Sequence, residues 1–316
     1  MDHQFNISVV IPTYNRAELL AGAIESLLAQ DASGFQYEVI VVDNNSTDKT
    51  RDVVESFSDR DRPVRYIFED RQGNAYARNA GITQSHASIV AFIDDDVRAS
   101  SNWIASVKTI FEKHPEVGFI GGKVLPVWTS TPPDWLTSQH WMPLGIQDHG
   151  EAEFYLEPVR VTGVISANLA VRRELLERVG MFSTRLQMVK GCIGGMEDHD
   201  LVDRLWRAGT VGMYVPQLVV ETPVDCQRTR KSYHRRWHKG HGRNYAIMRE
   251  ERMENASWYL FGVPAHLYRQ ALIDSVGLVK HWVGRREELA FLCEVHLWFF
   301  LGFWLKRVQD GQATST

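Results

Sequence analysis

Short apolar runs alternate with amphipathic stretches over the first 125 residues. Each run is continuous rather than alternating with polar residues, as in strands that are buried on both faces of a sheet. Between the runs, apolar residues recur at the spacing of one helix face, at 20–28 and again at 103–111. This repetition of strand and helix predicts a mostly parallel sheet flanked by helices. The predicted strands are 7–11, 39–42, 66–68, 89–93 and 117–120.

The pattern changes after residue 125. Residues 126–160 carry five prolines and three tryptophans, which predicts a loop-rich insertion that lines a cleft. Residues 258–307 show the spacing of two or three amphipathic helices. The elements expected between these regions are an apolar segment at 161–168, helices at 172–179 and 198–207, and a glycine-containing loop at 190–196.

These elements predict a two-part α/β domain followed by helices. We expect the domain over 1–252, with halves at 1–125 and 126–252, and a C-terminal helical extension over 253–316. The longest apolar run of the extension, 295–305, is shorter than the roughly 18 residues that cross a bilayer, so we expect a buried or interfacial helix there. No signal peptide is expected, because the first strand begins so close to the N-terminus.

Composition and charge narrow the class of protein. The chain is 44% hydrophobic and 23% charged, which is typical of a globular protein rather than a disordered one. Its three cysteines form no CxxC pair, so neither a disulfide framework nor a thiolate zinc site is expected, and a reducing, cytoplasmic compartment fits. The net charge is −11 over residues 1–225 and +7 over 226–316. A basic C-terminal part suits a phosphate or a lipid surface, whereas no motif indicates a nucleic-acid partner.

Acidic residues follow two of the predicted strands. Ligands of open α/β sheets bind at the carboxyl ends of the strands, and here 43–48 (DNNSTD) and 94–96 (DDD) occupy those places. Three consecutive aspartates repel one another unless a cation compensates them, and their hard oxygens suit Mg²⁺ or Mn²⁺. A lone aspartate after a strand is as often a turn or helix cap, which is our expectation for Asp48. Neither GxGxxG nor GxxxxGK[ST] is present, which argues against a dinucleotide or P-loop site.

A further acidic cluster, 197–200 (EDHD), begins the predicted helix at 198–207. One interpretation is helix capping, because acids are favoured at a helix N-terminus. The other is a general base, an ionised carboxylate that takes a proton from a hydroxyl. The residues alone leave both open.

Five segments, in this order, resemble the family 2 glycosyltransferases, which have the GT-A fold. The resemblance covers about residues 7–245 and implies a Rossmann-like nucleotide-binding half. The matching segments are 9–16 (VVIPTYNR), 42–48 (VDNNSTD), 73–81 (GNAYARNAG), 92–96 (FIDDD) and 197–201 (EDHDL).

The resemblance implies a donor site for a nucleotide-sugar. Asp43 would accept a hydrogen bond from the base, typically uracil, Arg78 would contact the donor side of the cleft, and Asp94 would hold the ribose or sugar. The other residues implied for nucleotide and donor binding are Pro12, Thr13, Tyr14, Arg16, Asn45 and Asp95.

The resemblance also implies the catalytic and metal-binding residues. Asp198 would be the catalytic base with Glu197 supporting it, and Asp96 would ligate Mg²⁺ or Mn²⁺ on the donor pyrophosphate. Many relatives carry a further metal-contacting histidine just after the strand near 215–220, where this chain reads VVETP. The candidates for that position are Glu221, His238 and His241, and Asn168 and Trp237 would belong to the wall for the donor sugar and acceptor.

The basic segment 233–243 (YHRRWHKGHGR) has two interpretations. It is either a solvated basic face or a loop that folds over the donor diphosphate, with Gly240 and Gly242 as flexible points. The tryptophans and cations of 258–307 likewise predict either packing against the catalytic domain or a peripheral membrane contact.

Together these features predict an inverting hexosyltransferase of class EC 2.4. It would transfer a sugar from a nucleotide-sugar, most simply a UDP-sugar, to a hydroxyl of a glycan or lipid-linked acceptor in cell-surface polysaccharide or glycoconjugate synthesis. The QxxRW motif of processive synthases is not met, so one sugar would be added per encounter. We expect a cytoplasmic enzyme, with a peripheral position at the inner face of the membrane as an alternative.

Two other functions remain alternatives. A nucleotidyltransferase that makes a nucleotide-sugar usually has a glycine-rich loop after its first strand, where this chain reads PTYN at 12–15. A non-catalytic sugar-binding scaffold on the same fold would not need the carboxylates of Asp96 and Asp198. Incubation with labelled UDP-sugars separates the scaffold from the transferase.

Overall fold

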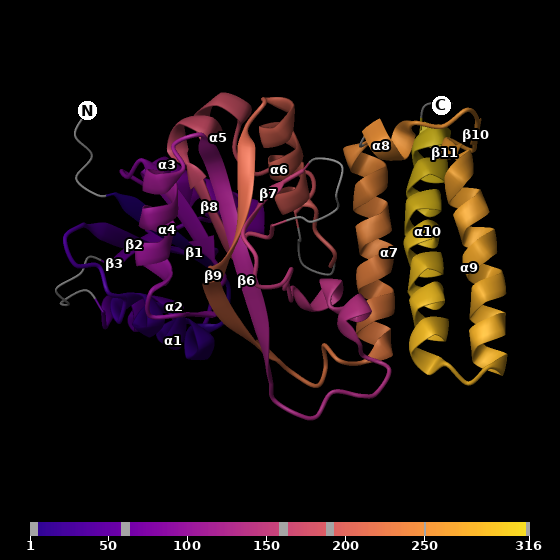
Figure 1. The fold of residues 1–316 in the computed structure, drawn as a ribbon, viewed down its shortest axis with the longest axis horizontal. Coiled ribbons are helices and arrows are strands. Elements are labelled where there is room, and N and C mark those ends of the chain that lie inside the picture. Colours follow the sequence, from indigo (N-terminus) through magenta and orange to yellow (C-terminus); the bar gives the residue numbers. More distant parts are fainter. Residues whose placement is uncertain (1–5, 58–63, 158–163, 188–192, 250, 314–316) are drawn as a thin grey trace. The chain divides into compact units, whose positions relative to one another are not determined.

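The computed structural model of this protein describes residues 6–57, 64–157, 164–187, 193–249 and 251–313 (Figure 1). The chain divides into two compact units. The first comprises Met1–Val127, Gly145–Lys190 and Glu197–Pro223, and the second comprises Trp128–Leu144, Gly191–Met196 and Val224–Thr316. The C-terminal segment of the second unit, Val224–Thr316, thus includes the strongly basic segment.

The first unit is built on one large sheet with the strand order β3-β2-β1-β4-β8-β6-β9-β5, in which β7 also pairs with β9. Its first half is parallel, as the sequence predicts, with β1 between β2 and β4. The strands of this half are β1 (Ile7–Thr13), β2 (Tyr37–Asp43), β3 (Val64–Phe68) and β4 (Ile89–Ile93).

The second half of the sheet is where the prediction of a mostly parallel sheet fails. β8 is antiparallel to both β4 and β6, and β5 and β7 are antiparallel to β9. A continuous apolar run indicates burial on both faces, but it does not distinguish the two strand directions when helices cover both faces. The strands of this half are β5 (Arg98–Ala99), β6 (Val117–Trp128), β7 (Phe154–Leu156), β8 (Asn168–Arg172) and β9 (Val211–Val224).

Helices cover both faces of the sheet, and alternate residues of each strand enter separate cores. In β1, Ile7, Val9 and Ile11 belong to the core that includes residues of α1 and α4, whereas Val10 belongs to the core that includes residues of α3, α5 and α6. This burial on both faces confirms the interpretation of the continuous apolar runs. The helices of the first unit are α1 (Ala17–Leu28), α2 (Thr50–Glu55), α3 (Asn74–Gln84), α4 (Trp103–Lys113), α5 (Arg173–Val179) and α6 (Glu197–Arg207).

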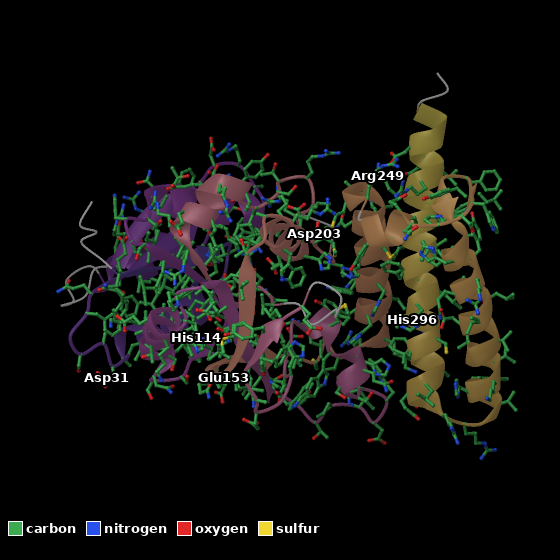
Figure 2. All side chains as sticks on the ribbon, turned by 45° about the horizontal axis from the view of Figure 1, so that its top comes forward. Asp31, His114, Glu153, Asp203, Arg249 and His296 are labelled. Atoms are coloured by element: carbon green, nitrogen blue, oxygen red, sulfur yellow. The ribbon has the colours of Figure 1, made fainter. Side chains whose placement is uncertain are left out.

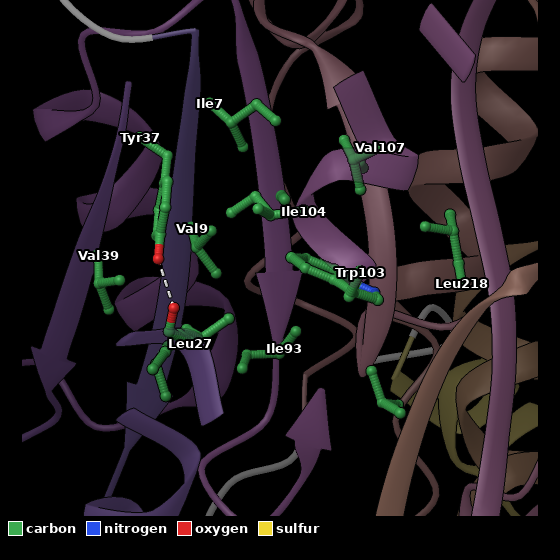
Figure 3. Close-up of a cluster of buried hydrophobic side chains, with 14 of the residues drawn as sticks. Ile7, Val9, Leu27, Tyr37, Val39, Ile93, Trp103, Ile104, Val107 and Leu218 are labelled. Carbon is green, nitrogen blue, oxygen red and sulfur yellow. Dashed lines mark hydrogen bonds between the residues drawn. The ribbon is translucent and has the colours of Figure 1, made fainter. Parts of the chain in front are cut away.

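Asn168 joins several elements inside the first of these cores. Trp103, which is fully buried in the cluster of Figure 3, donates its indole N–H to Asn168 Oδ1 at 2.8 Å. The Asn168 amide nitrogen in turn donates to the carbonyls of Lys123 and Leu218, both at 2.8 Å. Because Asn168 is 1% exposed, the structure places it in the sheet interior rather than on a wall of the site.

Two other expectations fall partly outside the described residues. Of the apolar segment expected at 161–168, residues 161–163 are not described, 164–167 form no strand, and β8 begins at Asn168. Of the loop expected at 190–196, residues 190–192 are not described, and neither is Cys192. The other two cysteines, Cys226 and Cys293, are free.

The second unit is helical. Its elements are the short 3-10 helices η1 (Ser138–His140) and η2 (Met142–Leu144), the helices α7 (Lys231–Met248), α8 (Glu251–Glu254), α9 (Ala265–Val283) and α10 (Glu287–Ala313), and the hairpin strands β10 (Tyr259–Leu260) and β11 (Val263–Pro264). In Figure 1, α7, α10 and α9 lie side by side. The basic segment 233–243 is therefore part of the continuous helix α7, so of its two interpretations the loop is wrong.

Glycines bring α7 and α10 into close backbone contact. A Cβ added to Gly242 would lie 2.0 Å from the carbonyl oxygen of Phe299, and one added to Gly302 would lie 1.9 Å from that of Lys239. A Cβ on Gly240 would lie 1.9 Å from the carbonyl oxygen of Ile193. These glycines serve close packing and not flexibility, and sequence alone could not distinguish the two roles because the neighbouring backbone comes from distant residues.

We expect Gly302→Ala to lower the free energy of unfolding by about 1–2 kcal/mol, because the cost of overpacking exceeds the gain in helix propensity. Gly311→Ala is the matched control on the same helix, since nothing lies within 4 Å of a Cβ added there. That control is expected to be neutral or to stabilise by up to about 1 kcal/mol. Urea unfolding measures the free energy of unfolding of both variants. A change in the same direction in both would contradict the close packing.

α10 is longer and more apolar than the run of eleven residues indicated. Among the described residues it is the one helix that could cross a bilayer by length and composition, over Glu287–Gly311, and 28% of its most apolar 18-residue stretch is buried. The expectation that no segment reaches this length is therefore wrong, because polar residues interrupt the run without ending the helix. A buried helix of a water-soluble protein passes the same test, and α10 packs here against the strongly basic α7.

Candidate functional site

The loops after β1 and β2 meet at the carboxyl end of the parallel half. Thr13 pairs with Asp43 at the last position of the two strands, so the loops emerge together. The backbone N–H of Asn15 donates to the Ser46 hydroxyl at 2.9 Å, and Asn15 Oδ1 accepts from the N–H of Thr47 at 2.7 Å. These hydrogen bonds hold the two loops together. They do not involve the side chains of Pro12 and Tyr14, and the Tyr14 side chain is exposed.

Asp48 caps helices, as expected. Its Oδ2 accepts from the N–H of Ala17 at the start of α1 at 3.0 Å, and its Oδ1 accepts from the N–H of Thr50 at 3.0 Å. A single carboxylate therefore caps two helices from outside their first turns.

Asp43 is buried at the end of β2. Its Oδ1 accepts from the N–H of Ser46 at 2.9 Å, and its Oδ2 accepts from the hydroxyl of Tyr66 at 2.7 Å. Each carboxylate oxygen has a second lone pair, so a base edge could still donate to Asp43. Neighbouring Asn45 is exposed with a φ of 66°, and its amide donates to the carbonyl of Asp70. Tyr66 is a partner of Asp43 that the sequence analysis did not identify.

An arginine compensates the charge of the aspartates after β4. One nitrogen of Arg16, Nη1, lies 3.0 Å from Asp95 Oδ1 and 2.9 Å from Asp96 Oδ2. Burial raises the pKa of Asp95 to about 6, although the charge of Arg16 opposes the shift. The Arg16 guanidinium lies between the two carboxylates, where a cation that contacts both would bind. Positive charge is therefore favourable at this position.

Arg78 lies at the centre of a second cluster of charges. It is 2% exposed, and it donates from Nη2 to Asp94 Oδ1 at 2.9 Å and from Nη1 to Glu197 Oε1 at 3.2 Å. Nη1 also lies 3.8 Å from Asp198 Oδ1. One guanidinium on α3 thus joins the end of β4 to the start of α6, although the sequence separates Arg78 from Glu197 by 119 residues.

Glu197 and Asp198 differ in environment. Burial raises the pKa of Glu197 to about 7, and the charge of Asp198 acts in the same direction while Arg78 opposes it. Asp198 Oδ2 accepts from the N–H of Ser166 at 3.1 Å, and its side chain stays 24% exposed. Within the described part of the chain, no donor makes a hydrogen bond to Asp198 Oδ1. Asp198 is thus the more accessible carboxylate of the pair, held in place from one oxygen.

Asp200, on the same helix, has a structural role. Its Oδ2 pairs with Arg204 at 2.7 Å, and Arg204 also donates to the carbonyls of Val179, Gly180 and Met181. Asp200 therefore orients the arginine that binds the carbonyls at the end of α5, and the general-base interpretation of the acidic cluster stays a prediction.

The residues considered as further metal ligands lie in different parts of the molecule. Glu221 is exposed on β9, where it pairs with Arg98 of β5, the residue two positions after Asp96. His238 and His241 lie on α7 in the second unit, where the ring of His241 stacks on Trp237 at 4.3 Å. Burial lowers the pKa of His238 to about 3. The described residues contain no cluster of three or more candidate ligands.

Asp95 and Asp96 nevertheless fit Mg²⁺ or Mn²⁺. These ions are commonly held by one or two carboxylates together with substrate phosphates and water, so a cage of protein ligands is not required. The two carboxylates already converge on one positive group, Arg16 Nη1.

A known protein family matches the first part of the chain. The model of the family described as glycosyl transferase family 2 matches residues 8–180. A glucosyl-dolichyl phosphate glucuronosyltransferase of Haloferax volcanii is 32% identical over 180 residues, which are 56% of this chain and 56% of the relative. A GalNAc(5)-diNAcBac-PP-undecaprenol beta-1,3-glucosyltransferase of Campylobacter jejuni is 35% identical over 112 residues, 35% of each chain. The matched region thus spans about half or less of these curated relatives.

Solved structures of low sequence identity share the fold. A mannosyltransferase from Pyrobaculum calidifontis in complex with GDP-Man and Mn²⁺ has a TM-score of 0.56 at 18% identity, and covers 98% of this chain and 76% of its own. TarS 1-349 of S. aureus in complex with UDP-GlcNAc has a TM-score of 0.56 at 16% identity, and covers 92% of this chain and 90% of its own.

Proposed function

The chain belongs to glycosyl transferase family 2, and we propose that it transfers a sugar from a nucleotide-sugar, a UDP-sugar, to a hydroxyl of a lipid-linked acceptor. The observation that carries this proposal is the buried Arg78, which binds Asp94 on the donor side and lies against Glu197 and Asp198 at the start of α6. One rigid cluster therefore fixes the spacing between a donor site and a candidate base.

Asp198 is the catalytic base in this proposal. The backbone N–H of Ser166 holds one of its oxygens, and its partial exposure lets an acceptor hydroxyl approach. The hydroxyl gives its proton to Asp198 and attacks the anomeric carbon from the face opposite the diphosphate, which inverts the configuration. Glu197 and Arg78 orient Asp198 and stay out of the proton transfer.

Asp96, with Asp95, would hold a divalent ion once Arg16 moves from between them. The bound ion would supply positive charge to the departing diphosphate. The Arg16 side chain is long enough to turn from the carboxylates toward the donor phosphates. Its guanidinium would then remain near the negative charge that develops on the departing diphosphate.

The acceptor class rests on the relatives. The Haloferax volcanii protein is named for a dolichyl phosphate substrate and the Campylobacter jejuni protein for an undecaprenol diphosphate substrate. Both names describe sugars carried on a polyprenyl phosphate or diphosphate, which supports a lipid-linked acceptor and an enzyme that works at the cytoplasmic face of a membrane. The motif of processive synthases is absent from the sequence, which supports transfer of one sugar per encounter.

The test combines transfer and binding. Purified protein is incubated with labelled UDP-sugars, Mn²⁺ and polyprenyl-linked sugars, and UDP affinity is measured by calorimetry with and without EDTA. We expect label in the lipid fraction, and at least about tenfold weaker UDP binding in EDTA or in Asp96→Ala, because phosphate charge is then uncompensated.

The control is Glu174→Ala, an exposed carboxylate in the first turn of α5 with no hydrogen bond or ion pair among the described contacts. It lies just after Arg173, which bonds to the carbonyl of Ser88 at the start of β4, at the opposite end of that strand from Asp94. Equal UDP affinity with and without the ion would refute the metal role, and absence of transfer to every acceptor would refute the function.

A further inference from the structure

The outer face of α9 is apolar. Leu272, Val276, Val279 and Val283 recur at the spacing of one helix side and are 67%, 63%, 61% and 70% exposed. Trp282, beside this row, is 75% exposed. We name these four aliphatic residues the α9 ridge, which at 1.5 Å per residue extends for about 17 Å.

The one acidic residue of the same helix, Asp274, faces inward. Asp274 is 6% exposed, and its carboxylate contacts the Gln270 amide at 3.1 Å and the ring of His296 on α10, labelled in Figure 2, at 3.2 Å. A helix on the surface of a water-soluble protein turns its apolar side to the core and its charges to solvent. α9 does the reverse along the ridge, which indicates that the ridge is covered by something other than water.

The charges next to the ridge have one sign. Arg269 and Lys280 lie on α9, and Arg285 and Arg286 lie in the turn that leads to α10; all four are exposed. In the part of the chain that the structure describes, none of them forms an ion pair with a carboxylate. Of the acidic residues nearest in sequence, Asp274 is buried, and Glu287, which follows Arg286, is engaged by Lys231 at 2.6 Å.

This charge distribution decides between two occupants. A second copy of the chain that packed its own α9 ridge here would bring the same cations together, because a two-fold interface pairs identical surfaces. A bilayer with anionic head groups instead offers hydrocarbon to the ridge and negative charge to the four cations. An exposed tryptophan beside them suits the interface between head groups and hydrocarbon.

We infer that the α9 ridge is a membrane-docking surface that lies in the plane of an anionic phospholipid bilayer. The inference extends the proposed function, since a lipid-linked acceptor is presented at a membrane, but the surface is argued from exposure and charge alone. α9 and not α10 makes this contact, because α10 packs along the basic helix α7 through Gly242 and Gly302.

The test is flotation of the full chain with vesicles, without substrates. Wild-type protein is expected to float with vesicles of equimolar phosphatidylcholine and phosphatidylglycerol and to bind pure phosphatidylcholine vesicles more weakly. The ridge variant, Leu272→Gln with Val276→Gln and Val279→Gln, is expected to lose at least about tenfold in bound fraction, because its aliphatic groups no longer gain by burial. Each changed residue is more than 60% exposed, so folding should persist, and circular dichroism checks this.

The matched control replaces three exposed apolar residues outside α9 by glutamine: Val127, Met142 and Val211. It should bind vesicles like the wild type. A charge variant, with Arg269, Lys280, Arg285 and Arg286 replaced by glutamine, should lose the preference for anionic vesicles, and added salt should do the same to the wild type.

Three results would overturn the inference. They are a wild type that does not bind the mixed vesicles, a ridge variant that binds as well as the control, and light scattering that shows a wild-type dimer and a monomeric ridge variant, which would make a second copy the occupant. Calorimetry with UDP separates this surface from the donor site. If vesicle binding holds while UDP binding and transfer are absent, the proposed function fails and the docking surface stands.

Discussion

Asp198→Asn is expected to lower the rate of sugar transfer by about 10²–10⁴-fold, the usual loss when a general base is removed. The amide oxygen of asparagine can still accept from the N–H of Ser166, as Asp198 Oδ2 does at 3.1 Å, so the helix start should keep its position. Asparagine cannot take up the proton of the acceptor hydroxyl. Donor affinity should change little, because Asp94, and not Asp198, is the carboxylate that the proposal places on the donor side.

The control for this variant is Asp203→Asn on the same helix, labelled in Figure 2. Asp203 pairs with Arg207 at 2.9 Å, and that arginine is 55% exposed, so the change should cost at most about 1 kcal/mol and leave the rate intact. Turnover and donor Kd are measured on the same preparations. A fall of less than about tenfold in Asp198→Asn would exclude it as the base. A parallel loss of donor affinity would instead assign it to the donor site.

Arg78→Met is expected to lower the free energy of unfolding by about 3–5 kcal/mol near neutral pH, the usual loss when one partner of a buried ion pair is removed. Methionine keeps much of the side-chain volume but leaves Asp94, Glu197 and Asp198 without their shared cation. Activity should be lost as well, because nothing then holds the start of α6 to the end of β4.

The effect of Arg78→Met should depend on pH. Arg78 lowers the pKa of Glu197, which burial already raises to about 7, so its removal raises that folded-state pKa further above the unfolded value. A carboxyl group with a raised folded-state pKa destabilises the fold as pH rises through the range between the two values. Because the folded-state pKa of Glu197 in the wild type is already about 7, both proteins lose stability alike below that pH, and the difference between them should widen as the pH rises above about 7.

Urea unfolding at several pH values measures this difference. Arg207→Met serves as the control, since it breaks the pair with Asp203 at the surface and should cost no more than about 1 kcal/mol at any of these pH values. Arg78→Lys should recover part of the stability, because lysine keeps the charge but cannot donate to Asp94 and Glu197 in the same fork geometry. A pH-independent gap would contradict the proposed sharing of charge.

The order of apolar and polar residues was sufficient to predict the strands of the parallel half of the sheet. β4 was predicted at its observed bounds, Ile89–Ile93, and the aspartates that follow it lie at the expected edge. These predictions depend on a period of two or 3.6 residues and on the rule that parallel strands end at one edge. Both are local properties, so they can be read from a single segment.

Predictions that depended on a distant partner did less well. Asn168 was expected on a wall, but Trp103, Lys123 and Leu218 use its amide inside the sheet. The glycines of 233–243 suggested a flexible loop, whereas Gly242 packs against Phe299 in a helix. A polar or small residue carries no local mark of the element it will meet, so its sequence context fits several roles equally well.

Hydrophobic periodicity and chain order place acidic residues at the ends of the strands and at the start of α6, and both can be read from the sequence. Which of these carboxylates share a cation follows from the folded structure alone. Arg16 bridges Asp95 and Asp96, and Arg78 joins Asp94 to Glu197. Charge pairing acts through space over a few ångströms, whereas these partners are 16 to 119 residues apart along the chain, and only folding brings them within that range.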